Sequence, residues 1–242
     1  MKTPLLSIII PTYNEESLLP GLLKSINAQV GISFEVIVAD NHSKDKTRKI
    51  ALAHGARVVE GGLPGRGRNH GAAVAKGEIL LFLDADVFLP ANDFLKKTVA
   101  EFNRNKLDIA TCIACPMSEN AIDKLCYGIY NFYIKMVGPL LRHAPGFCIF
   151  VRKNIHEAIG GFDEKIKLAE DHDYAERTKK IAKFGVLKSY PIVVSVRRFE
   201  RDGRLNVVTR YVLCEAYMIL KGPIKSDIFK YRFGYKNKKV KK

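Results

Sequence analysis

Two aspartates separated by one residue follow directly on an apolar run in the stretch ILLFLDADVFLP (79–90). The run Ile79–Leu83 fits a strand buried on both faces, as in a parallel sheet, and Asp84 and Asp86 would share one face if the strand continued. Carboxylates placed this close together repel each other unless a cation lies nearby. Because they offer only oxygen ligands, the pair suits Mg²⁺ or Mn²⁺. A solvated loop after the strand remains an alternative on this short motif alone.

A second acidic group lies in LAEDHDYAER (168–177), where Glu170, Asp171 and Asp173 fall at or near an expected helix start. The N-terminus of a helix favours negative charge and helps to keep such groups ionised. Simple helix capping would explain the same residues. His172, between the two aspartates, could complete a metal shell or could be an exposed histidine.

Four arginines occur in SVRRFERDGR (195–204), namely Arg197, Arg198, Arg201 and Arg204. The segment fits a basic surface loop. We favour a mobile lid that grips a diphosphate, or a phosphate on an acceptor, because guanidinium groups bind phosphate through paired hydrogen bonds.

The elements that position these groups alternate between strand and helix. Short β-rich runs predict strands at 5–10, 34–39, 57–59 and 79–83. Helices are expected at 15–30, at 43–54 with Ser43 or Asp45 as N-cap, and from the glycine-rich segment GGLPGRGRNHG (61–71) through Ala75. This order predicts an α/β fold with a mainly parallel sheet, in which the loops after the strands meet at one edge.

The second half of the chain is more mixed. Helices are expected at 92–105, 171–183 and 205–220, and strands at 107–115 and 147–151, with one or two short strands within 186–196. The aromatic stretch 125–141 and the segment 205–220 are candidates for an acceptor side, for a membrane-facing surface, or for ordinary core packing.

The 242 residues carry a formal charge of +15, with 47% hydrophobic and 27% charged residues, which is a globular composition that favours polyanionic ligands. Five cysteines without framework spacing favour a reducing, cytoplasmic setting, and apolar neighbours favour a core role for Cys112 and Cys115. The first residues do not fit a signal peptide, and no apolar run reaches the length of a membrane-spanning helix.

Four blocks together resemble the family 2 glycosyltransferases of the GT-A fold: SIIIPTYNEE, VIVADNHSKDKT, GRGRNHGAAVAKGEILLFLDADVFLP and GGFDEKIKLAEDHDYAER. The resemblance covers roughly residues 5–200, in matching order and spacing. It implies a GT-A, Rossmann-like sheet flanked by helices, and a metal-dependent enzyme that moves a sugar from a nucleoside diphosphate sugar with inversion of configuration.

The resemblance also implies roles for individual residues. The nucleotide and its ribose would be held by Pro11, Tyr13, Glu15, Asp40, Arg68 and Asp84. Asp86 would bind the metal directly, with Asp84 contacting ribose or metal-bound water. Asp171 would act as the general base, with Glu170 and Asp173 supporting it or the acceptor. Departures from the family pattern at Asn41, His42 and Gly67 leave the base open between uridine and guanosine donors, and Tyr174 is a mild departure in the motif of Asp171.

The expected organisation is a single catalytic domain at 1–204, followed by an amphipathic helix and basic tail at 205–242. Within the domain, residues 1–110 would form the nucleotide-sugar half and 111–204 the acceptor half. A glycan or a polyprenyl phosphate is the expected acceptor, with an anionic membrane surface as a partner and no nucleic acid. Two alternatives stay open from the residues: a phosphohydrolase with Asp84 as nucleophile, and a basic nucleic-acid-binding protein.

Overall fold

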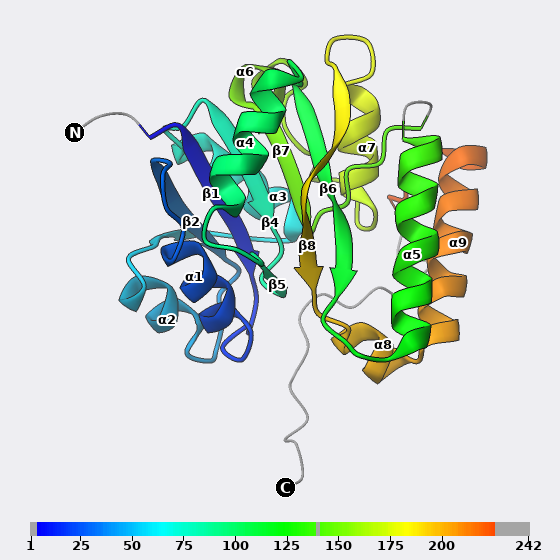
Figure 1. Ribbon diagram of the computed structural model, residues 1–242, viewed down its shortest axis with the longest axis horizontal. Coiled ribbons are helices and arrows are strands. Elements are labelled where there is room, and N and C mark those ends of the chain that lie inside the picture. Colours follow the sequence, from blue (N-terminus) through cyan, green and yellow to red (C-terminus); the bar gives the residue numbers. More distant parts are fainter. Residues whose placement is uncertain (1–3, 139–140, 226–242) are drawn as a thin grey trace, which may run out of the picture.

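The computed structural model describes residues 4–138 and 141–225. An eight-stranded sheet in the order β3-β2-β1-β4-β7-β6-β8-β5 runs through the molecule, with helices on both faces (Figure 1). This agrees with the α/β fold and flanking helices expected from the sequence.

The first half is the parallel part of the sheet. Its elements are β1 (Leu6–Thr12), α1 (Leu19–Asn27), β2 (Phe34–Asp40), α2 (Thr47–Ala53), β3 (Arg57–Glu60), α3 (Pro64–Val74) and β4 (Ile79–Leu83). β1 pairs in parallel with β2 and β4, and β2 with β3. The expected helices are present but shorter. The N-cap position of α2 is Lys46 and not the predicted Ser43 or Asp45, although Asp45 accepts a hydrogen bond from the Thr47 N–H. The side chain of Ser43 turns back to the end of β2.

The second half is mixed. Its elements are β5 (Val87–Phe88), α4 (Phe94–Arg104), β6 (Ile109–Pro116), α5 (Ala121–Val137), β7 (Cys148–Arg152), α6 (Lys153–Ala158), α7 (Glu170–Arg177), β8 (Phe184–Val194), α8 (Arg197–Asp202) and α9 (Arg204–Lys221). β7 runs antiparallel to β4 and β6, and β5 to β8, whereas β6 and β8 are parallel. The mainly parallel character therefore belongs to the first half. Residues 184–194 form one strand with a register shift opposite Cys112 and Ala114, not two strands.

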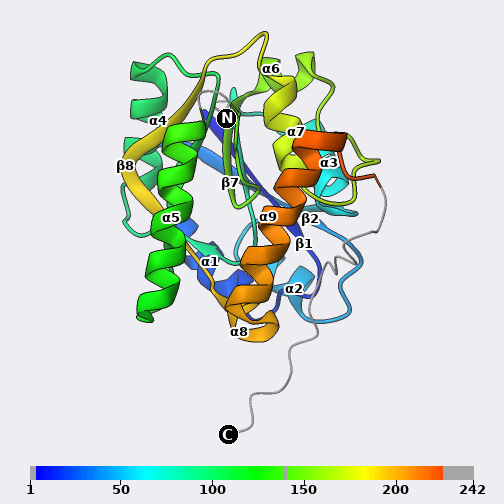
Figure 2. The same cartoon turned by 90° about the vertical axis from the view of Figure 1, so that its right-hand side faces the viewer.

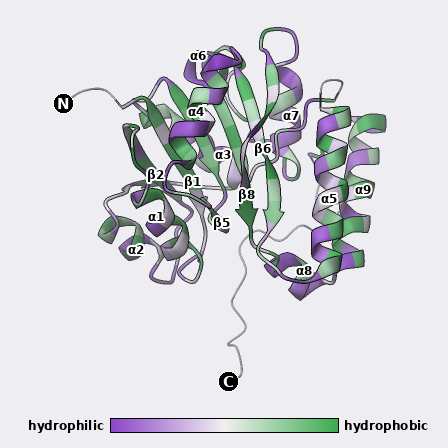
Figure 3. Cartoon of the chain, in the orientation of Figure 1, coloured by the Kyte–Doolittle hydropathy of each residue, from purple (hydrophilic) through white to green (hydrophobic). Residues whose placement is uncertain are grey.

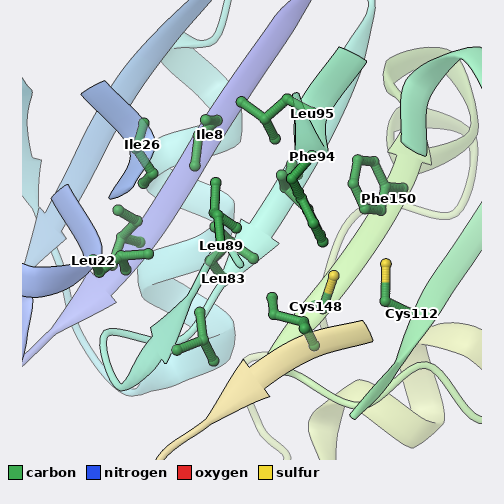
Figure 4. Packing of buried hydrophobic residues seen from close by; sticks show 14 of the residues in the cluster. Ile8, Leu22, Ile26, Leu83, Leu89, Phe94, Leu95, Cys112, Cys148 and Phe150 are labelled. Atoms are coloured by element: carbon green, nitrogen blue, oxygen red, sulfur yellow. The ribbon is translucent and has the colours of Figure 1, made fainter. Parts of the chain in front are cut away.

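The core forms on both faces of the sheet, and β1 and β4 are buried along their whole length. In Figure 4, Cys112 and Cys148 lie among apolar side chains that include Phe94 and Phe150. Cys115 is exposed, so the core role predicted for it is wrong. Cys115 lies on the face opposite Cys112 and close to the end of β6, where the strand is no longer buried on both faces.

Helices α5 and α9 lie outside the sheet at the same side of the molecule (Figures 1 and 2). Arg204 at the start of α9 binds Asp123 near the start of α5, and Glu215 accepts a hydrogen bond from Tyr133 further along, so the two helices run parallel. The amide of Asn131 bonds both backbone groups of Ala114 and fixes α5 to β6. The stretch at 125–141 is thus mostly helix.

Both helices expose large apolar side chains. Figure 3 shows hydrophobic residues in green along both ribbons. On α5 the exposed ones are Ile122, Leu125, Ile129, Phe132 and Met136, and on α9 they include Leu205, Val212, Ile219 and Leu220. Within the described residues, no helix combines the length and apolar character that crossing a membrane requires. The basic tail expected at 226–242 lies outside the described part of the chain.

Candidate active site

Carboxylates from two strand ends are bridged by one arginine. Glu15 follows β1, Asp86 follows β4, and Arg197 lies at the start of α8. The Arg197 guanidinium donates two hydrogen bonds to Glu15, at 2.7 and 2.8 Å, and a third from Nε to Asp86 at 3.0 Å. Burial raises the pKa of Glu15 against the opposing effect of Arg197. This contact draws the arginine-rich segment onto the acidic edge of the sheet.

A second arginine is buried behind this edge. Arg68 of α3 is 2% exposed and donates to Asp84 at 2.9 Å and to Glu170 at 2.6 Å. Burial would lower the pKa of Arg68, but the two carboxylates outweigh it and raise the pKa. Arg68 therefore joins the end of β4 to the start of α7. The nucleotide contact predicted for Arg68 stays a prediction, and the partners that the structure gives its guanidinium are the two acidic groups.

The glycine-rich segment makes this burial possible. Residues 64–74 form helix α3, not a flexible turn before a helix. A Cβ on Gly71 would lie 2.4 Å from Cγ2 of Ile9, and one on Gly67 would lie 3.2 Å from Cβ of Pro11. The glycines thus let α3 lie close against β1, which places Arg68 beneath the strand ends. Pro11 is buried in this contact.

Asp84 and Asp86 do not share one face of a continuing strand. β4 ends at Leu83 and the chain resumes as β5 at Val87, so both aspartates lie in the turn between the strands. Their partners differ, Arg68 for Asp84 and Arg197 for Asp86. Burial and the charges of Asp86 and Asp171 raise the pKa of Asp84, while Arg68 and Arg198 lower it. An arginine neutralises each of the two carboxylates. The turn between β4 and β5 therefore needs a positive charge.

The start of α7 presents Asp171 to the same region. Its Oδ2 accepts a hydrogen bond from the backbone N–H of Gly146 at 2.6 Å. Ala169, which precedes the helix, adopts the left-handed conformation with φ of 59°, and such strain in a non-glycine residue often accompanies functional sites. Burial would raise the pKa of Asp171, but His172, Arg68 and the Gly146 N–H together lower it. Asp171 is therefore held ionised.

Asp40, at the end of β2, is fully buried, and four protein groups donate to it. Thr12 and the Ser43 hydroxyl bond one oxygen, and the Ser43 N–H and Arg48 bond the other. The base contact predicted for Asp40 would require one of these bonds to be exchanged. The bond from Arg48 is the most accessible, because the Arg48 side chain is 48% exposed. Tyr13, in the loop after β1, is partly exposed.

The remaining predicted residues have other partners. Arg198 donates to the hydroxyl of Tyr211, Arg201 pairs with Asp202, and Arg204 makes a bidentate pair with buried Asp123. The carboxylate of Asp173 binds Arg177. Arg177 also donates to two backbone carbonyls of the turn that follows α6. Nδ1 of His172 lies 3.3 Å from Oε2 of Glu215 in α9, and its place in the metal shell at the DAD turn stays a prediction.

Residues that sequence reasoning missed complete the site. Gly146, in the loop before β7, supplies both the N–H for Asp171 and a carbonyl 3.4 Å from Arg68. No side chain marks this backbone role in the sequence. Asp123 also has no motif around it, although a buried carboxylate needs a cation such as Arg204.

A family model described as glycosyl transferase family 2 matches residues 7–160, which is more than half of the chain. The chain belongs to glycosyl transferase family 2. An uncharacterized glycosyltransferase of Haemophilus influenzae is 30% identical over 177 residues, which cover 70% of this chain and 60% of the relative. The chain thus spans less than two thirds of that relative. The resemblance stated from the four sequence blocks is confirmed.

Solved structures share the fold of this family 2 chain. A mannosyltransferase from Pyrobaculum calidifontis, in complex with GDP-Man and Mn²⁺, has a TM-score of 0.71 at 21% identity and covers 93% of this chain and 66% of its own. Glucosyl-3-phosphoglycerate synthase from Mycobacterium tuberculosis, in complex with Mn²⁺, UDP-glucose and phosphoglyceric acid, has a TM-score of 0.53 at 19% identity and covers 85% and 78%. The expected GT-A fold is confirmed. Membership of this family agrees with neither a phosphohydrolase nor a nucleic-acid-binding protein.

Proposed function

We propose that the chain transfers a sugar from a nucleoside diphosphate sugar to an acceptor, with inversion at the anomeric carbon. The observation that carries the proposal is the acidic edge, where Glu15, Asp84 and Asp86 converge from two strand ends and two arginines neutralise them. Such an edge attracts cations and, once neutralised, tolerates a diphosphate. Family membership and the shared fold support the same reaction class.

A divalent cation fits the turn between β4 and β5. Asp84 and Asp86 offer oxygen ligands only, which suits Mg²⁺ or Mn²⁺, and two solved relatives carry Mn²⁺. The cation would stabilise the negative charge that develops on the leaving diphosphate. Arg197 presently supplies the positive charge at Asp86, so its side chain is the one that has to yield.

The arginine-rich segment is placed to follow that exchange. Arg197 lies at the first position of α8, a six-residue helix, and its side chain is 26% exposed. A guanidinium released from Glu15 and Asp86 could bind phosphate oxygens instead, with Arg198 next to it in sequence. Tyr13, Asp40 and Pro11 remain the proposed wall of the nucleotide pocket. The two donor complexes among the relatives leave both uridine and guanosine diphosphates to be tested.

Asp171 is the proposed base. Its pKa is lowered, its Oδ2 accepts from the Gly146 N–H, and its charge raises the pKa of Asp84. With a hydroxyl acceptor, Asp171 would take the proton as the oxygen attacks the anomeric carbon. A phosphate acceptor is already ionised near neutral pH and would need only positioning. Asp171→Asn should therefore abolish transfer to a hydroxyl and only weaken transfer to a phosphate.

We also propose that the apolar face of α5 and α9 docks on an anionic membrane and so brings a lipid-linked acceptor to the site. Phe132 is 66% exposed and Ile129 62% exposed, on a stripe that continues along α5. Lys124 and Lys135 are exposed on the same helix. Apolar insertion beside basic side chains is the pattern of interfacial binding to anionic lipid.

Sedimentation with phosphatidylglycerol vesicles and with neutral phosphatidylcholine vesicles tests the membrane contact. Ile129→Asp with Phe132→Asp should release the protein from the anionic vesicles. Leu52→Asp, at a residue 62% exposed on α2, is the matched control and should stay bound. If the paired variant instead turns a dimer into a monomer and vesicles never bind, the face joins two copies of the chain.

The donor is tested by thermal stabilisation with UDP, GDP and their sugars, with and without Mn²⁺. Binding at ten to a hundred times Kd should stabilise the protein by roughly 1.5–3 kcal/mol. The shift should need the metal and should disappear in Asp86→Ala. It should persist in Glu176→Ala, which removes an exposed carboxylate paired with Lys179. A shift that is unchanged in Asp86→Ala would contradict the proposed metal ligands.

A further inference from the structure

Two histidines and a glutamate from three segments meet beneath α9. His143 lies in the loop after α5, His172 in α7 and Glu215 in α9, and one ligand atom of each lies within 4.8 Å of the others. Nε2 of His143 is 3.1 Å from Oε2 of Glu215, and Nδ1 of His172 is 3.3 Å from the same oxygen. Two imidazoles and a carboxylate thus converge on one small volume.

The two nitrogen–oxygen distances, 3.1 and 3.3 Å, are those expected between ligands of a tetrahedral metal ion. Ligand atoms about 2.0–2.1 Å from a common tetrahedral centre lie about 3.3 Å from one another. Hydrogen bonding alone leaves a defect here. Nδ1 of His172 is buried, and among the described residues it has no hydrogen-bond partner, although a carboxylate oxygen is 3.3 Å away. A buried nitrogen that lies beside a carboxylate oxygen without a hydrogen bond to it fits a pair of atoms that share a metal ion.

A neighbouring tyrosine fixes the orientation of the Glu215 carboxylate. The Tyr133 hydroxyl donates to Oε1 of Glu215 at 3.0 Å, which leaves Oε2 to face the two histidines. The imidazole rings lie close, with centroids 3.8 Å apart and planes at 58°. Outer-shell hydrogen bonds of this kind fix the orientation of carboxylate ligands in metal sites.

We propose that His143, His172 and Glu215 bind Zn²⁺, with the fourth position left to water. Two nitrogens and one carboxylate oxygen are a set that Zn²⁺ prefers, whereas the Asp84–Asp86 pair offers oxygen alone. The ion would tie α9 and the 141–146 loop to α7, the helix that carries Asp171. This site does not depend on the proposed donor or acceptor.

The test is zinc binding to untagged protein that has been stripped with a chelator. Calorimetry should give one equivalent of Zn²⁺ in the absence of nucleotide, and Co²⁺ in its place should show the visible absorption of tetrahedral coordination. Asp86→Ala should leave both signals unchanged, which separates this site from the proposed donor metal. His54→Ala, at the end of α2, is the histidine control.

Glu215→Gln and His143→Ala should each lower the affinity for Zn²⁺ by more than the roughly 10–100-fold that loss of an outer-shell partner costs. Tyr133→Phe leaves the three ligands in place and should weaken it about tenfold. If His143→Ala does not fold, Glu215→Gln and Tyr133→Phe still decide the matter. Failure of the wild type to bind one equivalent, or unchanged binding in Glu215→Gln, would overturn the site. Loss of the signals in Asp86→Ala alone would assign the ion to the other turn.

Discussion

Replacing Arg68 by methionine removes the cation that two acidic groups share. The methionine fills much of the same volume, so the change is mainly one of charge. The Glu170 side chain is only 13% exposed, and it loses a 2.6 Å hydrogen bond to Arg68. Because water cannot easily replace that bond, the loss should cost near the upper end of about 1.5–3 kcal/mol for a charged hydrogen bond. Asp84 is 40% exposed and can be resolvated, which places its share near the lower end. The expected destabilisation is about 4 kcal/mol, within the range for breaking a buried ion pair.

Urea unfolding followed by circular dichroism measures this loss, and pH identifies its cause. The pKa values of Asp84 and Glu170 are already raised by burial, and removing Arg68 raises them further. A carboxyl group whose pKa is higher in the folded protein lowers the free energy of unfolding when the pH is above that pKa. It has no such effect when the pH is below its pKa in the unfolded chain, about 4. The deficit of Arg68→Met should therefore shrink as pH falls from about 7 toward 4.

Arg66→Met is the matched control, because Arg66 is 56% exposed and lies 4.0 Å from Glu164. It should change stability by no more than about 0.5 kcal/mol. A deficit below about 1 kcal/mol for Arg68→Met, or one that is equal at both ends of the pH range, would refute the assignment of Arg68 as the shared cation.

Three further predictions concern packing, protonation and the arginine at the acidic edge. Gly71→Ala should cost about 1–3 kcal/mol in urea unfolding, because its Cβ would lie 2.4 Å from a methyl of Ile9, whereas Gly128→Ala, with open space on α5, should be neutral or stabilising. The pKa of His156 is lowered to about 4 by burial, so stability should fall by up to roughly 3 kcal/mol as pH drops from about 6.5 through 4, and His156→Gln should flatten that part of the curve. Arg197→Ala should strengthen Mn²⁺ binding to the nucleotide-free protein, measured by calorimetry, while slowing sugar transfer; weaker Mn²⁺ binding would contradict competition between this arginine and the metal.

The sequence predicted the parallel half well because its signals are local. Short β-rich runs stopped by polar or proline residues gave β1 to β4, and the helices between them were found with ends that were too long by several residues. No local pattern in the sequence indicated that β7 lies between β4 and β6 and runs antiparallel to both, since strand pairing depends on partners far apart in the chain. The aromatic stretch that begins at 125 also hid a helix, because its polar residues, such as Asn131, serve contacts to another element.

For the site, residue types and their order were informative, while partners were not. The sequence placed Glu15, Asp84 and Asp86 after strands and Asp171 at a helix start, and the fold brings them to one region. It offered Arg68 as a nucleotide ligand, and the fold buries Arg68 between two carboxylates. Their roles in donor binding and catalysis stay predictions.

By itself, the sequence determined the fold class, the family and the carboxylates available for chemistry, because these depend on local patterns and on motif spacing. Only the tertiary structure decided which cation each carboxylate meets, that Gly146 holds Asp171, and that His143 and Glu215 join His172. Those contacts join residues tens of positions apart, and their strength depends on how fully the surrounding chain removes water from them. Neither the pairing of these residues nor the strength of their contacts can be read from the sequence, because both depend on the packed sheet and helices.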